Sequence, residues 1–477
     1  MKKLVAFFVL ALLASPASAL PGFFVGSDEN GVTVPSTKII IASHQNHQVL
    51  TVMPSLVSTE KELAFLMPLP LGTTRENIRT LSPAAFDALD KLSAPRLVEV
   101  TDPNPCTRTD GPVQPKTITS ATYNTTLDAS YDISILDRAS GQDLLPWLEK
   151  NGYKLPPKAE QIIEPYTQRG TVFALIKLHR NSTGNGLLPP IQISYDAPKI
   201  ILPLRLGLVN RPKMIEPPKA GKEAIVYNSE PDRTNPQPIK HVDIFNDGAQ
   251  AVTLYVLTQY GIATSPLMRS VQLENTRNEV FLPTFAADHF TDIVEGIKNF
   301  RAKAESNAMI LEYAGIAGNA DVPDALLQSI GVSWLNEAPA APVAGQVTDT
   351  ANNDNLLNNN LLGGMLLPKA AYPKHLRAQA SANGKAYLTR LYLRYMANAL
   401  PQDLLLQESQ SQQNIATAYH VQHPWVGGSE PKDSCQGAAL YQQSVQTRET
   451  HALETLTRLT GLSASALAEK FTAQGAK

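Results

Sequence analysis

The sequence predicts an α+β fold, mainly antiparallel β-sheet in a sandwich-like arrangement with amphipathic helices packed on it. Short apolar runs bounded by turn residues recur along the chain, and this pattern is typical of strands. The 36 prolines among 477 residues favour ordered turns and edge-limited strands over long helices. A few segments repeat apolar residues at helical spacing, which predicts helices with one buried face.

Residues 63–100 show these patterns in succession. The apolar run Leu-Ala-Phe-Leu at residues 63–66 predicts a strand. Pro68 and Pro70 follow it and lack a backbone N–H. We therefore expect the chain to leave the sheet there, or to lie at a sheet edge.

A helix is expected after this strand. Ser82 can accept a hydrogen bond as its cap, and Pro83 suits the first helical position, where its missing N–H costs nothing. Pro95 ends the helix, because the residue before a proline is pushed out of the helical conformation. Extended chain follows to residue 100. The buried face of this helix would consist of Phe86, Leu89 and Leu92.

The other strands are predicted from similar apolar runs. They cover residues 38–41, 48–53, 131–136, 171–178, 191–195, 200–209, 239–245, 251–259, 308–313, 387–395, 404–407 and 415–422. The first two, with the strand at 63–66, suggest an antiparallel meander. Strand, two helices and strand between residues 131 and 178 are compatible with a crossover unit. The sequence Asn-Asp-Gly-Ala at 246–249 predicts a hairpin turn, because these residue types accept positive φ.

Four more helices are predicted, at residues 142–150, 157–169, 287–304 and 438–460. Asp288 lies near the start of the third, where a carboxylate suits the positive end of the helix dipole. An acid–base pair of Asp288 with His289 is the less favoured interpretation. Gly461 is suited to ending the last helix. The inward face of that helix would hold Leu440, Tyr441, Val445, Leu453, Leu456 and Leu459.

Residues 1–19 have the features of a signal peptide. Lys2 and Lys3 precede an apolar run, and small residues up to Ala19 form a cleavage site. That run is shorter than the roughly 20 residues that a membrane-spanning helix needs, and no later segment is apolar enough to span. We therefore expect export, cleavage near Ala19, no transmembrane segment in the mature chain, and a periplasmic or secreted location.

The mature chain is expected to have three parts. Residues 20–337 form a β-rich α+β core, and residues 338–360 form a flexible loop rich in Asn, Pro and Ala. The strands and helix of residues 361–477 are expected to pack back on the core. Cys106 and Cys435 would form a disulfide in an oxidising compartment, and two separate thiols are the alternative.

Several short motifs resemble those of one bacterial family when taken in their order along the chain. They include Pro-Gly-Phe-Phe at 21–24, Met-Pro-Leu-Pro at 67–70, Phe-Asp-Ala-Leu-Asp at 86–90, Ala-Pro-Arg at 94–96, Leu-Pro-Leu-Arg-Leu-Gly at 202–207 and His-Pro-Trp at 423–425. The chain resembles domain-of-unknown-function family 2330. That resemblance implies a secreted or envelope protein and no established activity. Family members often carry a cysteine where Leu20 and Pro21 stand here, so a cross-link from that cysteine is absent.

Two pairs of histidines are candidates for binding a metal, since imidazole is a common ligand. His44 stands with His47, and His420 stands with His423. Strand residues three apart point to opposite faces, which argues against a shared ion. A polar loop at His44 and a packed His-Pro-Trp corner at His423 are the favoured interpretations.

Two further sets of charged residues are candidates for ligand binding. Asp349 and Asp354 lie in the Asn-rich loop and could coordinate calcium, but no glycine stands at the sharp-turn position of an EF-hand, and a solvated loop is favoured. Three arginines lie in apolar strand contexts. A buried arginine needs a carboxylate partner, and this structural pairing is favoured over a shared anion site. The three are Arg96, Arg205 and Arg390.

The sequence contains no hydrolase nucleophile elbow, phosphate-binding loop, dinucleotide fingerprint or zinc motif. We therefore assign no catalytic, cofactor-binding or metal-ligating residue. The net charge of −2 gives no electrostatic reason to expect nucleic acid as a partner. The expected function is that of a non-catalytic binding or structural protein of the cell envelope, with an envelope protein as partner. An exported hydrolase with an unrecognised active site is the alternative, so whether the chain is an enzyme stays open.

Overall fold

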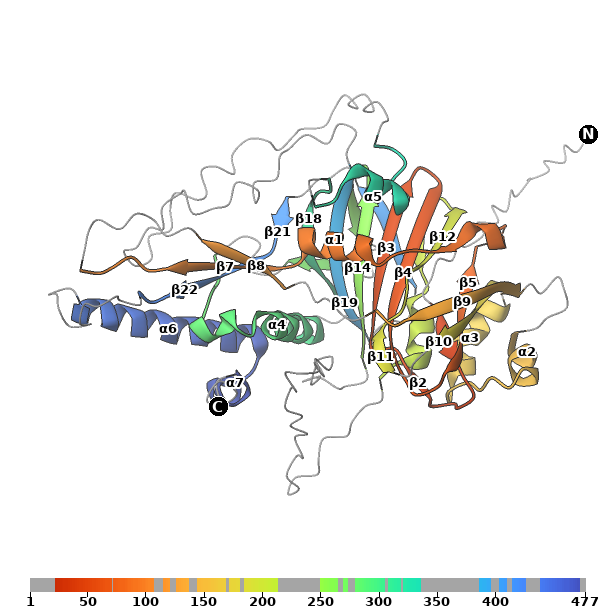
Figure 1. Ribbon diagram of the computed structural model, residues 1–477, viewed down its shortest axis with the longest axis horizontal. Coiled ribbons are helices and arrows are strands. Elements are labelled where there is room, and N and C mark those ends of the chain that lie inside the picture. The colour runs from red at the N-terminus through yellow and green to blue at the C-terminus, as the bar shows by residue number, and fades with distance from the viewer. Residues whose placement is uncertain are drawn as a thin grey trace, which may run out of the picture.

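Two facing sheets, the helices that cover them and a projecting arm make up the protein (Figure 1). The computed structural model describes residues 22–70, 72–106, 115–120, 126–136, 144–168, 171–180, 184–212, 249–264, 269–272, 279–304, 308–318, 321–335, 386–395, 403–409, 414–425 and 438–471. Antiparallel pairings predominate, which confirms the predicted α+β class.

The smaller of the two facing sheets has four antiparallel strands in the order β1-β5-β10-β9. They are β1 (Phe23–Val25), β5 (Glu62–Leu69), β9 (Ala129–Leu136) and β10 (Val172–Arg180). Pro68 stays within β5, opposite Phe173 of β10. Because β1 pairs only with residues 64–66 of β5, Pro68 lies beyond its reach, where a missing N–H is tolerated.

The larger sheet has eleven strands, and its main path runs β16-β18-β19-β14-β3-β4-β12-β6. The pairs β3–β14 and β16–β18 are parallel. Its members are β2 (Val32–Thr33), β3 (Ser36–His44), β4 (His47–Ser58), β6 (Ile78–Thr80), β11 (Gly184–Leu187), β12 (Ile191–Asp196), β14 (Gln250–Thr258), β16 (Arg269–Gln272), β18 (Ala308–Ile316), β19 (Tyr387–Tyr395) and β21 (Ile415–Ala416).

Helices cover the outer faces of both sheets. The helices α2 (Leu144–Lys150) and α3 (Ala159–Gln168) pack on the smaller sheet, and α1 (Ala84–Ser93) and α5 (Asp324–Ser329) pack on the larger one. α1 begins at Ala84 with Pro83 at the N-cap, one residue later than predicted, and the Ser82 hydroxyl accepts a hydrogen bond from the N–H of Ala84 at 3.3 Å. The helix ends at Ser93, before Pro95, as predicted.

The arm consists of a small sheet in the order β17-β22-β7-β8 and of helices packed on it (Figure 1, left). Its strands are β7 (Arg96–Thr101), β8 (Lys116–Thr119), β17 (Phe281–Leu282) and β22 (Ala418–His423). Its helices are α4 (Phe290–Ala304), α6 (Ala438–Thr460) and α7 (Ala464–Phe471). A further sheet joins β13 (Ile200–Leu202), β20 (Leu404–Ser409) and β15 (Gly261–Thr264). Short 3₁₀ helices span η1 (Arg75–Asn77), η3 (Leu204–Asn210) and η5 (Thr284–Ala287).

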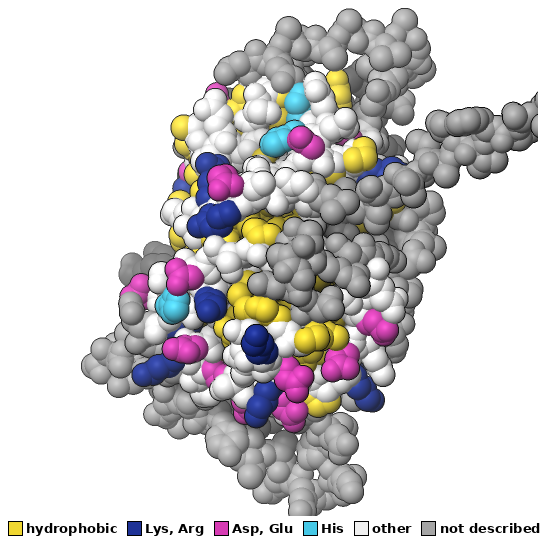
Figure 2. Space-filling view, turned by 90° about the vertical axis from the view of Figure 1, so that its right-hand side faces the viewer, with side chains coloured by type: hydrophobic (Ala, Val, Ile, Leu, Met, Phe, Trp, Pro, Cys, Tyr) yellow, Lys and Arg dark blue, Asp and Glu magenta, His cyan; other side chains and the backbone are white. Residues whose placement is uncertain are grey.

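Charges of both signs mix on the end of the molecule that lies away from the arm (Figure 2). Lysine, arginine, aspartate and glutamate side chains are interspersed there with apolar ones, so the described part of this face presents no region of a single sign. A face of this kind has no long-range pull on a strongly charged partner.

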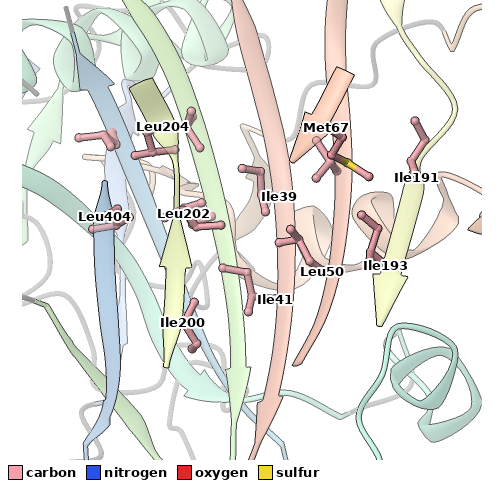
Figure 3. Close-up of a cluster of buried hydrophobic side chains, with 14 of the residues drawn as sticks. Ile39, Ile41, Leu50, Met67, Ile191, Ile193, Ile200, Leu202, Leu204 and Leu404 are labelled. Carbon is pink, nitrogen blue, oxygen red and sulfur yellow. The ribbon is translucent and has the colours of Figure 1, made fainter. Parts of the chain in front are cut away.

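The main core lies between the two facing sheets (Figure 3). Side chains alternate along each strand, so Ile39 and Ile41 of β3 enter this core while Ile40 faces α1 on the outside. Met67 reaches the same core from the smaller sheet. Since helices cover the outer faces as well, the two sheets form the middle layers of a four-layer body.

Strands from the C-terminal part of the chain are interleaved with earlier ones. β19 lies between β14 and β18 in the larger sheet. β20, β21 and β22 each pair with a strand that precedes residue 320. All the sheets except β1-β5-β10-β9 are therefore completed only when strands from the C-terminal part join earlier ones.

Four predictions about arrangement were wrong. β5 is not part of a meander with β3 and β4, since it pairs with β1 and β10 in the other sheet. The strands at each end of the proposed crossover unit, β9 and β10, are antiparallel neighbours. The stretch 200–209 changes at Pro203 from strand to 3₁₀ helix. Leu440 of α6 is 71% exposed and does not face inward.

Some predictions fall outside the described residues. These are the signal peptide at 1–19, the hairpin arm at 239–245 with its turn, and the loop at 338–360. The second arm of that hairpin is β14, which pairs with β3 on one side and β19 on the other. Among the described helices, none has the length and apolar character that crossing a membrane would require.

Candidate functional site

Five charged side chains meet on the outer face of the larger sheet, between the part covered by α1 and the part covered by α4. We call this group the Arg390 cluster, and its members are Lys38, Asp90, Lys298, Glu312 and Arg390. The side chains of Asp90 and Glu312 are 3% and 0% exposed, and the side chain of Arg390 is 7% exposed. Charges this deep in a protein are stable only when they are paired.

The local sequence explains how these side chains meet. Arg390 of β19 lies beside Tyr255 of β14, so both point to the same face of the sheet. Asp90 lies on the buried face of α1, one turn after Phe86. Glu312 is the additional residue of a β-bulge in β18, where the register with β19 shifts between Leu311 and Tyr313. A bulge re-aims side chains, and this one accompanies the approach of Glu312 to Arg390.

Asp90 accepts hydrogen bonds from three elements of the sheet. Nη1 of Arg390 donates to its Oδ1 at 2.7 Å, and Nζ of Lys38 donates to its Oδ2 at 2.5 Å. The hydroxyl of Tyr255 also donates to Oδ1. α1 is thereby joined to β3, β14 and β19 through one carboxylate.

Glu312 binds the Nε side of the Arg390 guanidinium. Nε of Arg390 donates to its Oε2 at 2.7 Å, and Nζ of Lys298 lies 3.2 Å from its Oε1. Lys298 belongs to α4, and its ammonium also lies 4.4 Å from the centre of the Tyr392 ring. The Arg390 cluster therefore connects α1 and α4 across the outer face of the larger sheet.

The electrostatics of the cluster favour the charged forms. Burial by itself raises the pKa of Asp90, but the charges of Arg390 and Lys38 outweigh it and lower that pKa. For Glu312, burial is likewise outweighed by Lys298 and Arg390, so its pKa is lowered. Burial and the neighbouring carboxylate of Asp90 raise the pKa of Tyr255, which keeps its hydroxyl a donor. The cluster acts as a set of structural ion pairs.

A second charged group lies in the arm, at the end of β7. We call it the Asp102 latch, and it consists of Asp102, Gln422, Tyr441 and Arg448. Asp102 is 3% exposed. It accepts from Nε2 of Gln422 at 2.6 Å, from the Tyr441 hydroxyl at 2.8 Å and from Nη2 of Arg448 at 2.8 Å. The latch fastens α6 to β7 and β22.

The first histidine pair has an arrangement that the sequence argument missed. His44 and His47 flank a two-residue turn and lie directly opposite each other, so they share a face. The expectation that they point apart was wrong, because they belong to two strands and not to one. The His44 ring stacks on Trp334 at 5.2 Å, while Nδ1 of His47 lies 2.9 Å from Oδ1 of Asp196.

The second pair lies on a single strand, β22. His420 is 8% exposed and its ring lies 5.4 Å from that of Phe281. Burial lowers its pKa to about 4, so it is neutral at neutral pH. Nε2 of His423 lies 2.7 Å from Oε2 of Glu99. Among the described residues, no three histidine, cysteine, aspartate or glutamate side chains gather as metal ligands would.

The three arginines do not share one anion site. Arg390 has the carboxylate partners that its apolar setting predicted. Arg96 donates from Nη2 to the carbonyl of Leu92 at the end of α1, and Arg205 lies in η3, in another part of the body. Asp288 lies just before α4, near the helix start as expected. Asp349 and Asp354 are outside the described residues.

A small cavity lies between the two facing sheets, beside η3. Its wall includes Phe24, Phe65, Asn210 and Gln250. Asn210 exchanges two hydrogen bonds with the backbone of Phe24, at 2.6 and 3.0 Å. Nε2 of Gln250 donates to the carbonyl of Val34 at 3.2 Å, and its Oε1 accepts from the Tyr395 hydroxyl at 3.0 Å. The amide groups in this wall thus join η3 to β1, and β14 to β19 and to the segment before β3.

Sequence reasoning identified Arg390 but missed its partners. A weak signal for each carboxylate was present: Asp90 shares the helical face of Phe86 and Leu89, and Glu312 interrupts an apolar strand. A charged residue in such a position needs a buried partner. The partners lie 78 and 300 residues away in the sequence, so only the fold could pair them.

Comparison with known protein families gives a match over most of the chain. The family described as an uncharacterized protein conserved in bacteria, DUF2330, matches residues 15–407. The matched range contains all five members of the Arg390 cluster, while Gln422, Tyr441 and Arg448 of the Asp102 latch lie beyond it. No curated protein and no solved structure matches the chain.

Proposed function

We propose a binding or structural role in the bacterial cell envelope for this chain, which belongs to the DUF2330 family of uncharacterized bacterial proteins. The observation that supports it is the use of the buried charges. In the Arg390 cluster and the Asp102 latch, the carboxylates accept hydrogen bonds or ion pairs from several elements at once. Such groups hold the fold together, so the protein acts through the surface that this rigid frame presents.

The sequence of residues 1–19 supports the envelope location within this proposal. The basic start, apolar run and small-residue site of residues 1–19 match a signal peptide, and cleavage near Ala19 would leave β1 close to the new N-terminus. The mature chain then enters the periplasm or leaves the cell. An oxidising compartment of this kind also permits disulfides.

A disulfide between Cys106 and Cys435 forms part of the same proposal. Cys106 follows Asp102 by four residues, and Cys435 precedes Tyr441 by six. The Asp102 latch holds Tyr441 against Asp102, and this contact between residues near the two cysteines in sequence supports the proposed bond. Cys435 itself is outside the described residues. Intact mass before and after reduction tests the bond: two free thiols in exported protein would contradict it.

The role is tested by cross-linking in intact cells. The full chain, tagged at its C-terminus, is treated with a cross-linker in its own bacterium, and the envelope fraction is compared with the cytosol. We expect a discrete cross-linked species in the envelope fraction. The matched control lacks residues 2–19 and should remain in the cytosol without that species. Recovery of the exported chain only as an uncross-linked monomer would contradict the proposal.

A further inference from the structure

The two halves of α6 are held in different ways. The second half is packed in the core of the arm, where Ala452, Leu456 and Thr460 are at most 4% exposed. In the first half, residues 438–448, Ala438 is the one buried residue. The first half therefore has little apolar burial to hold it in place.

Polar contacts at the Asp102 latch replace that burial. The Tyr441 hydroxyl donates to Asp102 at 2.8 Å and accepts from the backbone N–H of Trp425 at 2.7 Å. Nη2 of Arg448 donates to the same carboxylate at 2.8 Å, and its Nη1 lies at 3.4 Å. One aspartate side chain is therefore the main non-covalent polar attachment of residues 438–448.

The boundary between the halves has its own contact. The carboxylate of Glu449 accepts from the N–H and the hydroxyl of Thr284, at 3.1 and 3.3 Å. This contact ties α6 to η5 immediately after Arg448. It fixes the point beyond which the helix stays docked on α4.

We propose that residues 438–448 form a strap that opens and closes at the Asp102 latch while residues 449–460 stay docked. Segments held by few apolar contacts open with a lower free energy than the core around them. Opening separates Tyr441 and Arg448 from Asp102, and it exposes that carboxylate and the N–H of Trp425 at the ends of β7 and β22. The strap is free to open when Cys106 and Cys435 are reduced, and as a conformational device of the arm it does not depend on the envelope role.

Hydrogen exchange followed by mass spectrometry tests the strap in the full mature chain. The exchange of peptides from residues 438–448 is compared with that from residues 453–460. A reductant is present throughout, so that no disulfide of Cys106 holds the strap closed. Two variants weaken the latch from opposite sides, Asp102→Ala and Tyr441→Phe, and Tyr441→Phe changes little but the hydroxyl. Thr447→Ala is the matched control, because its exposed hydroxyl bonds within the helix to the carbonyl of Gln443.

We expect faster exchange of residues 438–448 than of 453–460 in the unmodified chain. Each latch variant should accelerate exchange of 438–448 by about tenfold or more, since hydrogen bonds to charged groups contribute enough for that factor. Exchange of residues 453–460 should stay unchanged in both latch variants. The Thr447→Ala variant should exchange at the same rate as the unmodified chain. The strap proposal is wrong if the latch variants leave the exchange rate of residues 438–448 unchanged. It is also wrong if exchange accelerates equally in both halves of α6.

Discussion

Arg390 is held by two carboxylates, and the removal of either leaves charge buried without its partner. Breaking a buried ion pair in this way costs about 3–5 kcal/mol, whereas an exposed pair contributes about 0–1 kcal/mol. The difference arises because water replaces a lost partner at the surface and cannot do so in the core. Substitutions in the Arg390 cluster, with their effect on the free energy of unfolding, therefore test whether these buried charges stabilise the fold.

Substitution of Glu312→Ala is expected to lower the free energy of unfolding by about 3–5 kcal/mol, because Arg390 and Lys298 both lose their contact with it. Urea unfolding followed by circular dichroism measures this. The matched control is Lys91→Ala, which breaks the exposed pair with Asp321, whose side chains are 55% and 44% exposed. The control should change stability by about 1 kcal/mol or less. Equal effects for the two variants would contradict a structural role of the cluster.

His420 predicts a loss of stability in mild acid. Its pKa is about 4 in the folded protein, while an unfolded histidine titrates near 6.5, so the unfolded state binds more protons between these values. Stability should fall as the pH drops from about 6.5 to 4, by up to about 3 kcal/mol from this residue. The pKa values of Asp90 and Glu312 are lowered in the folded protein, so these residues also make stability depend on pH. Their contribution is lost at more acidic pH than that of His420, where the two carboxylates become protonated.

The measurement is urea unfolding at intervals between pH 7 and pH 4. His420→Gln should flatten the dependence of stability on pH in this window. The control is His451→Gln, at a side chain that is 81% exposed, and it should leave the slope as it is. A slope that survives in His420→Gln would show that other groups cause the acid sensitivity.

At the scale of the element, local signals predicted type better than orientation. The bounds of α6 and β19 agree with the sequence pattern, because each has a long run of one periodicity and a clear stop. The inward face of α6 was less predictable. Leu440 was expected to be buried and is 71% exposed, since the helix projects along the arm, where its first half contacts strand ends through polar groups.

Gly461 and Gly296 predict opposite outcomes for the same substitution. Gly461 has φ of +68° after α6, and a Cβ there would lie 2.2 Å from the Phe300 ring. Gly461→Ala should therefore destabilise the protein by at least about 1 kcal/mol, through strain and the displaced ring. Gly296 lies inside α4, and a Cβ there would meet no atom of another element within 4 Å. Gly296→Ala should stabilise by about 0.5–1 kcal/mol. Thermal unfolding checks both, and shifts of the same sign would contradict this account.

At the scale of the whole molecule, the order of strands was beyond local sequence patterns. Apolar runs predicted that β3, β4 and β5 exist, but nothing in them shows that β5 belongs to the other sheet. The position of β19 between β14 and β18 depends on pairing across more than 70 residues. Such pairings are determined by competition among all strands for the same sheet edges, which a local pattern does not contain.

The interleaving of β19 predicts that the N-terminal part does not fold alone. A chain ending at residue 360 lacks the strand between β14 and β18, and it also lacks β22 and β20, which pair with β7 and β13. We expect it to lack a cooperative unfolding transition, and we expect residues 361–477 to restore one when the two fragments are refolded together. Circular dichroism during urea titration checks this. A cooperative transition in the shorter chain by itself would show that its sheets are complete without β19.

The functional account depends most on export, and one measurement tests it directly. The full-length chain is produced in its own bacterium, and its intact mass is determined in the periplasmic or medium fraction without reductant. We expect the mass of a chain that begins at or near Leu20. We also expect this mass to be lower by two hydrogen atoms than that of the same chain with two free thiols, because a Cys106–Cys435 bond removes two hydrogens. A chain that retains Met1 and residues 2–19 and is found in the cytosol would contradict it.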